Sequence, residues 1–242
     1  MDATEYFKMV RELSGSFAET AADNLDTEIA HLDNWKVADL VAHLGGVYAY
    51  ATRNAQAEST EPTPPQPKSQ PPEGGDLMDW FAKRREVLLK TLDETPLDQA
   101  CWTHAGMQTA EWWRRRMTHE STIHLWDLRA GIGEPQPIES DRATDGVNEF
   151  LHMNKAVNAI RQRHVYPAGS LHLHRTDGPG EWMVQRGSSE TELSITTEHG
   201  KGDAAVRGPA SELQLWVWGR PVTDIEIFGD SAVAEAWRNL AP

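Results

Sequence analysis

The spacing of apolar residues changes partway along this 242-residue chain, and this change constrains the fold more than any other feature. Up to about residue 131, apolar side chains recur at intervals of three and four, which is typical of amphipathic helices. Beyond Pro135, after one further helix, they begin to alternate, as in strands with one buried face. We therefore predict an α+β protein, in which a four-helix bundle (residues 1–140) precedes a smaller α+β domain with an antiparallel sheet (residues 141–242).

Helix-terminating residues place the elements of the first domain. Asp76 and Thr109 are suited to cap the third and fourth helices, and Gly131 is suited to end the fourth. The proline-rich stretch 59–75 cannot form a regular helix, so it is expected to be a long connection. The predicted helices span residues 3–31, from near 37 to beyond 50, 76–92 and 109–131.

The second half of the chain combines helices with short strands. Its predicted strands lie around 171–174, 182–184, 193–195 and 223–228, and its predicted helices span 142–163, 209–218 and 230–240.

Charge and hydropathy limit the partners. The chain has 37 acidic and 23 basic residues, a net charge of −14, so a polyanion such as DNA would be repelled. The one basic cluster, Arg114 to Arg116, is interpreted as a solvated helix face. No apolar run is long enough to cross a membrane, and the N-terminus has no signal-peptide pattern. We expect a cytoplasmic protein that binds neither nucleic acid nor membrane, and no sequence feature indicates an oligomeric state.

Cys101 is the single cysteine, which excludes an internal disulfide and a multi-cysteine zinc site. The simpler interpretation is a small buried apolar residue, because a nucleophilic thiol needs a base or a cation nearby. If the protein performs thiol chemistry, we expect the thiol to arrive as a small molecule.

The fourth helix carries the strongest local signal. One of its faces presents Trp113, Met117, Glu120, His124 and Leu128, because steps of three and four residues return to the same side. A carboxylate and an imidazole one turn apart therefore interrupt an apolar stripe. A buried carboxylate needs a partner, and the Glu-x-x-x-His spacing allows both side chains to bind one ion.

His43 occupies an equivalent place on the core-facing side of the second helix. Together with Glu120 and His124 it completes two imidazoles and one carboxylate, the ligand set of an open catalytic zinc site. The alternatives are an exposed Glu–His ion pair and a hydrogen-bonded core histidine. His119 is a competing ligand, but it lies about 100° around the helix from Glu120. The remaining histidines, at 31, 104, 152, 164, 172, 174 and 199, show no ligand spacing, and those at 172 and 174 are expected to point outward from a strand.

Three segments resemble one family, the mycothiol-dependent maleylpyruvate isomerases. They are WKVADLVAHLGG (35–46), HESTIHLWD (119–127) and AAVRGPASELQLWVWGR (204–220), the last followed by Gly229-Asp230 and Trp237. In that family a DinB-like, metal-binding four-helix bundle precedes a domain that is like a sterol carrier protein. The likeness covers nearly the whole chain and keeps the segments in order. One departure is Lys36, where the family usually has a Ser or Thr helix cap.

The resemblance implies that His43, Glu120 and His124 bind a divalent metal, with Zn²⁺ expected, and that a low-molecular-weight thiol, with mycothiol expected, is the cosubstrate. A thiol bound to zinc is deprotonated, and we expect the thiolate to attack a small electrophilic substrate. The outcome would be S-transfer or thiol-assisted cis–trans isomerisation. Two alternatives stay open: a hydrolase with a metal-bound hydroxide, and a non-enzymatic metal- or ligand-binding module, which a fourth ligand such as His119 would favour.

Arg220 is the one catalytic candidate outside the bundle. It matches an arginine that closes the family's active site from the C-terminal domain, and a guanidinium there would orient an anionic group of the substrate. The alternative is a surface ion pair with Asp224 or Glu226.

Overall fold

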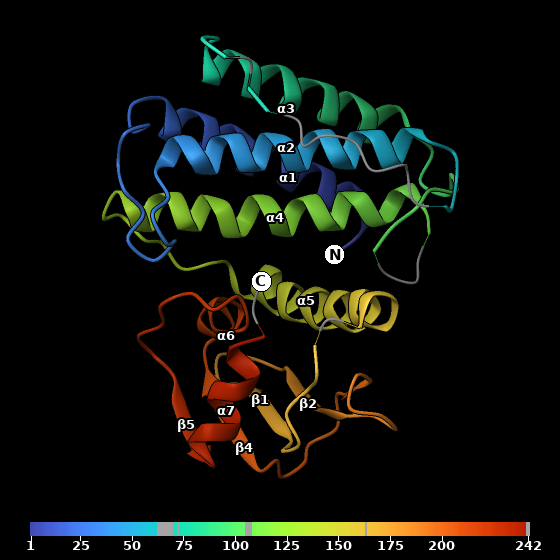
Figure 1. The fold of residues 1–242 in the computed structure, drawn as a ribbon, viewed down its shortest axis with the longest axis vertical. Coiled ribbons are helices and arrows are strands. Elements are labelled where there is room, and N and C mark those ends of the chain that lie inside the picture. Colours follow the sequence, from blue (N-terminus) through green and yellow to red (C-terminus); the bar gives the residue numbers. More distant parts are fainter. Residues whose placement is uncertain (62–69, 72, 105–107, 163, 241–242) are drawn as a thin grey trace. The chain divides into compact units, whose positions relative to one another are not determined.

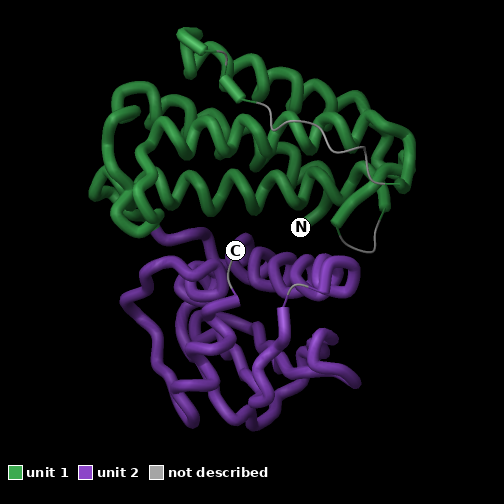
Figure 2. Tube along the Cα trace, in the orientation of Figure 1, with its two compact units in different colours: residues 1–136 green, residues 137–242 purple. Residues whose placement is uncertain are grey.

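The computed structural model describes residues 1–61, 70–71, 73–104, 108–162 and 164–240. The chain divides into two compact units, Met1–Gln136 and Pro137–Pro242 (Figure 2). The first is helical and the second combines helices with a sheet, so the predicted α+β fold class is confirmed. Within the described residues, no helix combines the length and hydropathy needed to cross a membrane.

Four helices form the first unit (Figure 1). α1 packs mainly against α4, and α2 packs against α3 and α4. The interior is apolar and almost fully excluded from solvent, with Phe17, Leu44, Phe81 and Met117 among its residues. This burial supplies most of the free energy that holds the helices together. The four helices are α1 (Ala3–Ala22), α2 (Val37–Gln56), α3 (Leu77–Glu94) and α4 (Ala110–Gly131).

α1 is shorter than the predicted helix of residues 3–31. It ends at Ala22, and the Asn24 side chain donates to the carbonyl of Thr20 at 2.8 Å. The chain then turns through residues 23–36, with Asn34 in the left-handed region at φ 59°. Ile29 is 1% exposed, so it keeps the helical spacing of apolar residues although it packs from a turn. Asp and Asn side chains compete for the backbone here, which explains why the helix ends early.

α3 and α4 begin at the predicted N-cap residues, but only one of the two residues makes a capping hydrogen bond with its side chain. Asp76 caps α3 by accepting a hydrogen bond from the Asp79 amide at 2.8 Å. Thr109 is the N-cap of α4 by position, without a side-chain hydrogen bond. At the start of α2, Lys36 cannot accept a hydrogen bond, but Asp39 still accepts one from the Lys36 amide at 2.8 Å. The expected proline-rich connection falls largely outside the described residues.

The second unit is built on a five-stranded sheet with the order β3-β2-β1-β4-β5. Helices α5, α6 and α7 pack against its strands. The strands are β1 (Leu171–Arg175), β2 (Glu181–Arg186), β3 (Leu193–Thr196), β4 (Ala204–Gly208) and β5 (Glu226–Gly229), and the helices are α5 (Ser140–Arg161), α6 (Ala210–Val217) and α7 (Ser231–Arg238).

One strand pair differs from the predicted antiparallel sheet. β4 was not predicted as a strand, and it runs parallel to β1, whereas the other neighbouring pairs are antiparallel. Parallel neighbours need a crossover connection, and residues 197–203 supply it by leading from β3 at one edge back to β4. The sheet is therefore mixed.

The strand register separates two kinds of side chain. Leu171 and Leu173 share a face with their cross-strand partners Val184 and Trp182, and all four are buried. The intervening residues of β1 point to the opposite face, because successive side chains alternate. That face therefore carries His172 and His174.

Candidate metal centre

The structure brings His43, Glu120 and His124 together. Each offers one donor atom, and the three atoms lie within 4.8 Å of one another. His43 comes from α2 and is exposed, whereas Glu120 and His124 come from α4 and are only 8% and 5% exposed. The imidazole rings of His43 and His124 lie 4.9 Å apart between centroids, at nearly a right angle. One turn of α4 and a facing position on α2 thus form a group of three potential ligands.

Glu120 divides its two oxygens between two neighbours. Oε1 pairs with the buried guanidinium of Arg116, one turn earlier on α4. Oε2 lies 3.2 Å from Nε2 of His124. Burial alone would raise the pKa of Glu120, but the charge of Arg116, followed by His124 and His43, lowers it well below its usual range. Glu120 is therefore an anion at neutral pH, and Oε2 faces the two imidazoles.

His124 is oriented by a fully buried carboxylate. Its Nδ1 lies 3.1 Å from Oδ2 of Asp127, and the other oxygen of Asp127 lies 2.9 Å from Nε2 of His31. Burial works to lower the pKa of His124, but the hydrogen bond with Asp127 and the nearby Glu120 carboxylate raise it. A carboxylate that accepts from Nδ1–H fixes the ring and its tautomer, which is the usual support for a metal-binding histidine.

The donor set fits a borderline divalent ion such as Zn²⁺. Nε2 of His124 is buried and makes no hydrogen bond, although Glu120 Oε2 is only 3.2 Å away. The two groups are therefore close to each other without being aligned for a hydrogen bond, and the donor atom of His43 lies within 4.8 Å of both. Arg116 already compensates the buried charge of Glu120, so carboxylate burial is not itself an argument for an ion. The argument rests on the remaining oxygen and two converging imidazoles.

The competing side chains lie elsewhere in the bundle. His119 is fully buried and packs edge-on against Tyr6 of α1 at 6.4 Å, and it does not belong to the group of converging donors. Cys101 is also fully buried, and burial raises the pKa of its thiol. This environment suits the simpler interpretation of Cys101 as a small core residue, and it disfavours a thiolate nucleophile.

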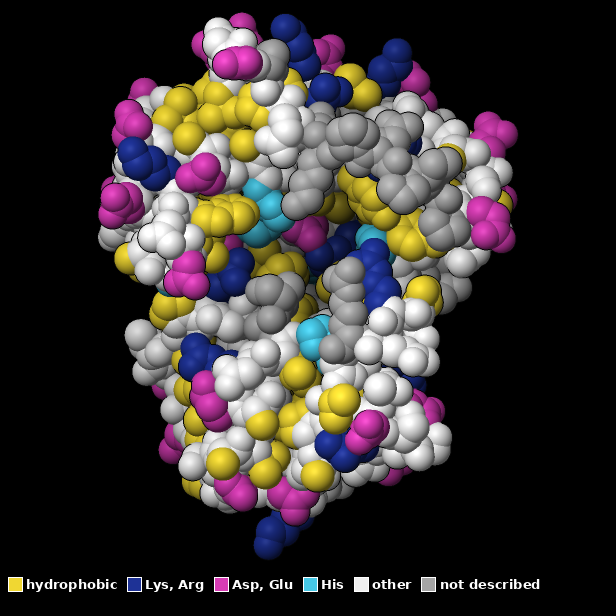
Figure 3. Space-filling view, viewed as in Figure 1, with side chains coloured by type: hydrophobic (Ala, Val, Ile, Leu, Met, Phe, Trp, Pro, Cys, Tyr) yellow, Lys and Arg dark blue, Asp and Glu magenta, His cyan; other side chains and the backbone are white. Residues whose placement is uncertain are grey.

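The interpretation of Arg114 to Arg116 as a solvated face is wrong. Arg116 is 6% exposed and pairs with Glu120, and Arg114 donates to the carbonyls of Leu92 and Ala3. Arg114 thus reaches α3 and α1, and Arg116 pairs with a carboxylate of its own helix. On the part of the surface that Figure 3 displays, Lys and Arg side chains occur in small, separate groups among acidic ones.

Arg220 lies in unit 2, just after α6 and next to Gly219, whose φ is 70°. Its side chain is 9% exposed and donates to the Trp218 carbonyl at 2.9 Å. Such burial is not that of a surface ion pair, because Asp224 and Glu226 are both exposed. Arg220 is therefore held at the end of α6 by its own backbone turn.

Sequence reasoning missed the residues that support the three donors. Asp127 follows His124 by three residues and so shares its helix face, which is a usable signal. His31 gives no such signal, because it lies in the turns of residues 23–36. The expectation that the C-terminal histidines are unrelated is also wrong, because His172, His174 and His199 meet around Glu181.

The family profile "Mycothiol maleylpyruvate isomerase N-terminal domain" matches residues 8–129, and the profile "MDMPI C-terminal domain" matches residues 141–236. No curated protein matches the chain at a significant level. Among solved structures, the mycothiol-dependent maleylpyruvate isomerase aligns with a TM-score of 0.63 at 13% identity, and a histidine-to-alanine mutant of it aligns with 0.65 at 14%. Each alignment covers 94% of this chain and 93% of the other.

Proposed function

Because the chain belongs to the mycothiol maleylpyruvate isomerase family, we propose that it is a metal-dependent enzyme that activates a low-molecular-weight thiol, mycothiol, toward a small electrophilic substrate. The observation that carries the proposal is the convergence of His43, Glu120 and His124, with His124 oriented by Asp127. The solved isomerases are too distant in sequence to add more than the fold.

His43, Glu120 and His124 would hold the ion. Two imidazoles and one carboxylate suit Zn²⁺, and a set of three protein ligands leaves room for an exogenous one. When bound, the ion lowers the pKa of a thiol so that the thiolate is present at neutral pH.

The surrounding residues keep the donors in the required state. Asp127 retains the proton at Nδ1 of His124, which leaves Nε2 as the ligand atom. Arg116 engages Oε1 of Glu120 and so presents Oε2 to the two imidazoles. Both supporting side chains are buried, which limits the motion of the donors.

The proposed reaction begins with addition of the thiolate to an electrophilic carbon. If that carbon belongs to a double bond conjugated to a carbonyl, a C–S bond forms and the π electrons move to the carbonyl oxygen. Rotation about the resulting single bond, followed by return of the electrons and breaking of the C–S bond, gives a cis–trans isomer and releases the thiolate. If the neighbouring α-carbon of the enolate instead takes a proton from solvent, the C–S bond stays and the product is the S-conjugate, so one site serves both outcomes.

Arg220 is proposed to bind an anionic group of the substrate. The proposal is supported by the planar fork of a guanidinium, which matches a carboxylate, and by the buried setting of this side chain. It also agrees with the place of Arg220 in the third segment that resembles the family.

The metal content of purified variants tests the three ligands. His43→Ala, Glu120→Ala and His124→Ala should each contain about one divalent ion fewer than the parent, because removal of one of three ligands weakens a site severely. Elemental analysis measures this directly. His119→Ala is the matched control, since it removes a buried histidine of the same helix and should keep the parental metal content. If a ligand variant kept all of its metal, that residue would not belong to the site.

A further inference from the structure

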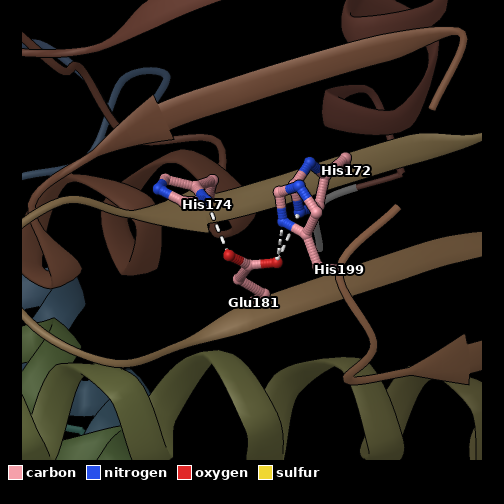
Figure 4. Close-up of side chains that lie close together, drawn as sticks. All are labelled: His172, His174, Glu181 and His199. Carbon is pink, nitrogen blue, oxygen red and sulfur yellow. Dashed lines mark hydrogen bonds and ion pairs between the residues drawn. The ribbon is translucent and has the colours of Figure 1, made fainter. Parts of the chain in front are cut away.

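A second group of potential ligands lies in unit 2, on the sheet face opposite the buried apolar side chains. His172, His174, Glu181 and His199 each offer one donor atom, and all four atoms lie within 4.8 Å of one another. Figure 4 shows the three imidazoles turned toward the carboxylate of Glu181. No part of the proposed reaction uses these residues.

The strand register explains why the four side chains meet. His172 and His174 are two residues apart on β1 and so share one face. Glu181 of β2 lies directly opposite His174 in the antiparallel pair. The crossover of residues 197–203, which leads from β3 back to β4, adds His199 to the same group.

The distances show that Glu181 is central to the group. Its Oε1 lies 3.0 Å from Nδ1 of His174, and its Oε2 lies 3.3 Å from Nε2 of His172 and 2.7 Å from Nδ1 of His199. Ligand atoms around a tetrahedral ion with bonds of about 2.0–2.1 Å are separated by about 3.3 Å. The three contacts with the two oxygens of Glu181 are of this order, and the four donor atoms, one from each residue, lie within 4.8 Å of one another.

A hydrogen-bonded cluster without metal is the simpler alternative, but it does not account for His172. His199 does satisfy this alternative, because its Nδ1 donates a hydrogen bond to Oε2 of Glu181 at 2.7 Å. Nε2 of His172, in contrast, is buried without a hydrogen-bond partner, although the carboxylate is within reach. A buried ring nitrogen in this condition is costly, and a ligand bound to it would remove the cost.

We propose that His172, His174, Glu181 and His199 form a second transition-metal site, distinct from the site of His43, Glu120 and His124. Three imidazole nitrogens and one carboxylate oxygen suit Zn²⁺ and its neighbours in the first transition row, and they do not suit Ca²⁺ or Mg²⁺, which prefer oxygen ligands. Four protein ligands close a tetrahedral shell, which is typical of structural sites.

A bound ion would link the crossover of residues 197–203, through His199, to strands β1 and β2 of the sheet. The side chain of His199 is 79% exposed and forms an ion pair with Glu181, whereas His172 is 8% exposed and belongs to β1. A hollow of ≈ 500 Å³, lined in part by His172, His199 and Gly202, borders the group and gives an ion access. Metal binding would therefore order residues 197–203.

The test is a Zn²⁺ titration of the chelator-stripped, full-length protein by calorimetry. The background is a His43→Ala, His124→Ala double variant, which removes the first site. We expect this background to bind one Zn²⁺ ion per chain, at the second site. Adding Glu181→Gln or His199→Ala to this background should lower its affinity for Zn²⁺ by about tenfold or more. Adding His164→Ala, which replaces a histidine outside the group, should leave the affinity unchanged.

The readouts separate the two sites from each other and from misfolding. His199 is exposed on a connection, so its replacement by alanine should leave the circular dichroism spectrum unchanged. Zn²⁺ should also slow hydrogen exchange of the amides of residues 197–203 in the background variant and not in its His199→Ala derivative. A background that binds no Zn²⁺, or binding that is indifferent to both Glu181→Gln and His199→Ala, would overturn the proposal, whatever the first site does.

Discussion

Asp127 illustrates how a residue outside a group of converging donor atoms can orient one of them. It is fully excluded from solvent, and its two oxygens lie 3.1 Å from Nδ1 of His124 and 2.9 Å from Nε2 of His31. A buried carboxylate is tolerated only when it is paired in this way. The consequence is that His124 presents a defined nitrogen toward Glu120 and His43.

Asp127→Asn tests this support. An amide can accept from one histidine, but its NH₂ group then faces the other, so His124 should lose its fixed orientation. We expect Zn²⁺ affinity at the first site to fall by roughly 10- to 100-fold, measured by competition with a chelator. His31→Gln should weaken binding in the same direction but less. If Asp127→Asn lowered the melting temperature and left the Zn²⁺ affinity unchanged, Asp127 would be a structural residue only.

Arg220→Lys tests the proposed anion contact. Lysine keeps the charge but loses the bidentate fork, so we expect metal content and fold to be kept while turnover of an anionic substrate falls by one to two decades. That loss corresponds to about 1.4 to 2.8 kcal/mol of transition-state binding. Steady-state kinetics measure it, with Arg220→Ala as the larger change. Equal rates for the parent and both variants would place Arg220 outside the site.

The sequence predicts which side chains lie close together when both belong to one helix that fixes their spacing. Glu120 and His124 are one turn apart on α4, so their proximity follows from the helix alone. The partnership of His31 with Asp127 does not, because it joins a turn to a helix 96 residues away. The proximity of His172, His174 and His199 was not predicted for a similar reason. The crossover that supplies His199 depends on a strand pairing that the local sequence pattern does not reveal.

Asp177 acts at the scale of elements, because it joins three of them. It accepts hydrogen bonds from Ser140 at the start of α5, from Arg175 at the end of β1 and from the Ala210 amide at the start of α6. Burial works to raise the pKa of Asp177, but these hydrogen bonds and the charge of Arg175 lower it to about 2. The carboxylate thus stabilises the packing of unit 2.

The lowered pKa of Asp177 predicts a dependence of stability on pH. Because the pKa is lower in the folded state, the stabilisation is fully present above the unfolded value, about 4, and is lost as the pH falls through about 2. The side chain is 32% exposed, so solvent screening reduces the effect to about 1 kcal/mol. Hydrogen exchange of the unit 2 amides, measured between pH 4 and pH 2, should show this loss as reduced protection at the lower pH. Asp177→Asn should remove this component, and an unchanged pH profile in that variant would contradict the assignment.

Most elements could be predicted from the sequence, and the exceptions have physical causes. Helical spacing and a capping aspartate were sufficient for α3, and alternation was sufficient for β1 and β2. α1 was predicted too long because Ile29 keeps a helical interval while packing from a turn. β4 was missed because its parallel pairing with β1 brings together residues about 33 positions apart.

At the scale of the whole molecule, the chain combines a bundle that carries the candidate metal centre with an α+β unit that carries Arg220 and the second histidine group. We propose that these units correspond to the domains 1–140 and 141–242. The two profile matches fall on either side of residue 140. The bundle alone supplies the three donors, so metal binding at the first site should not depend on Arg220.

The proposed chemistry requires a thiol and a metal ion to meet at His43, Glu120 and His124. The most direct measurement is the absorption spectrum of the Co²⁺-substituted protein during a titration with mycothiol. We predict a new thiolate-to-cobalt charge-transfer band in the parent and in Glu181→Gln, and no such band in His43→Ala or His124→Ala. A fully Co²⁺-loaded parent whose spectrum does not respond to mycothiol would contradict the account, and it would favour a metal-bound hydroxide or a purely binding role instead.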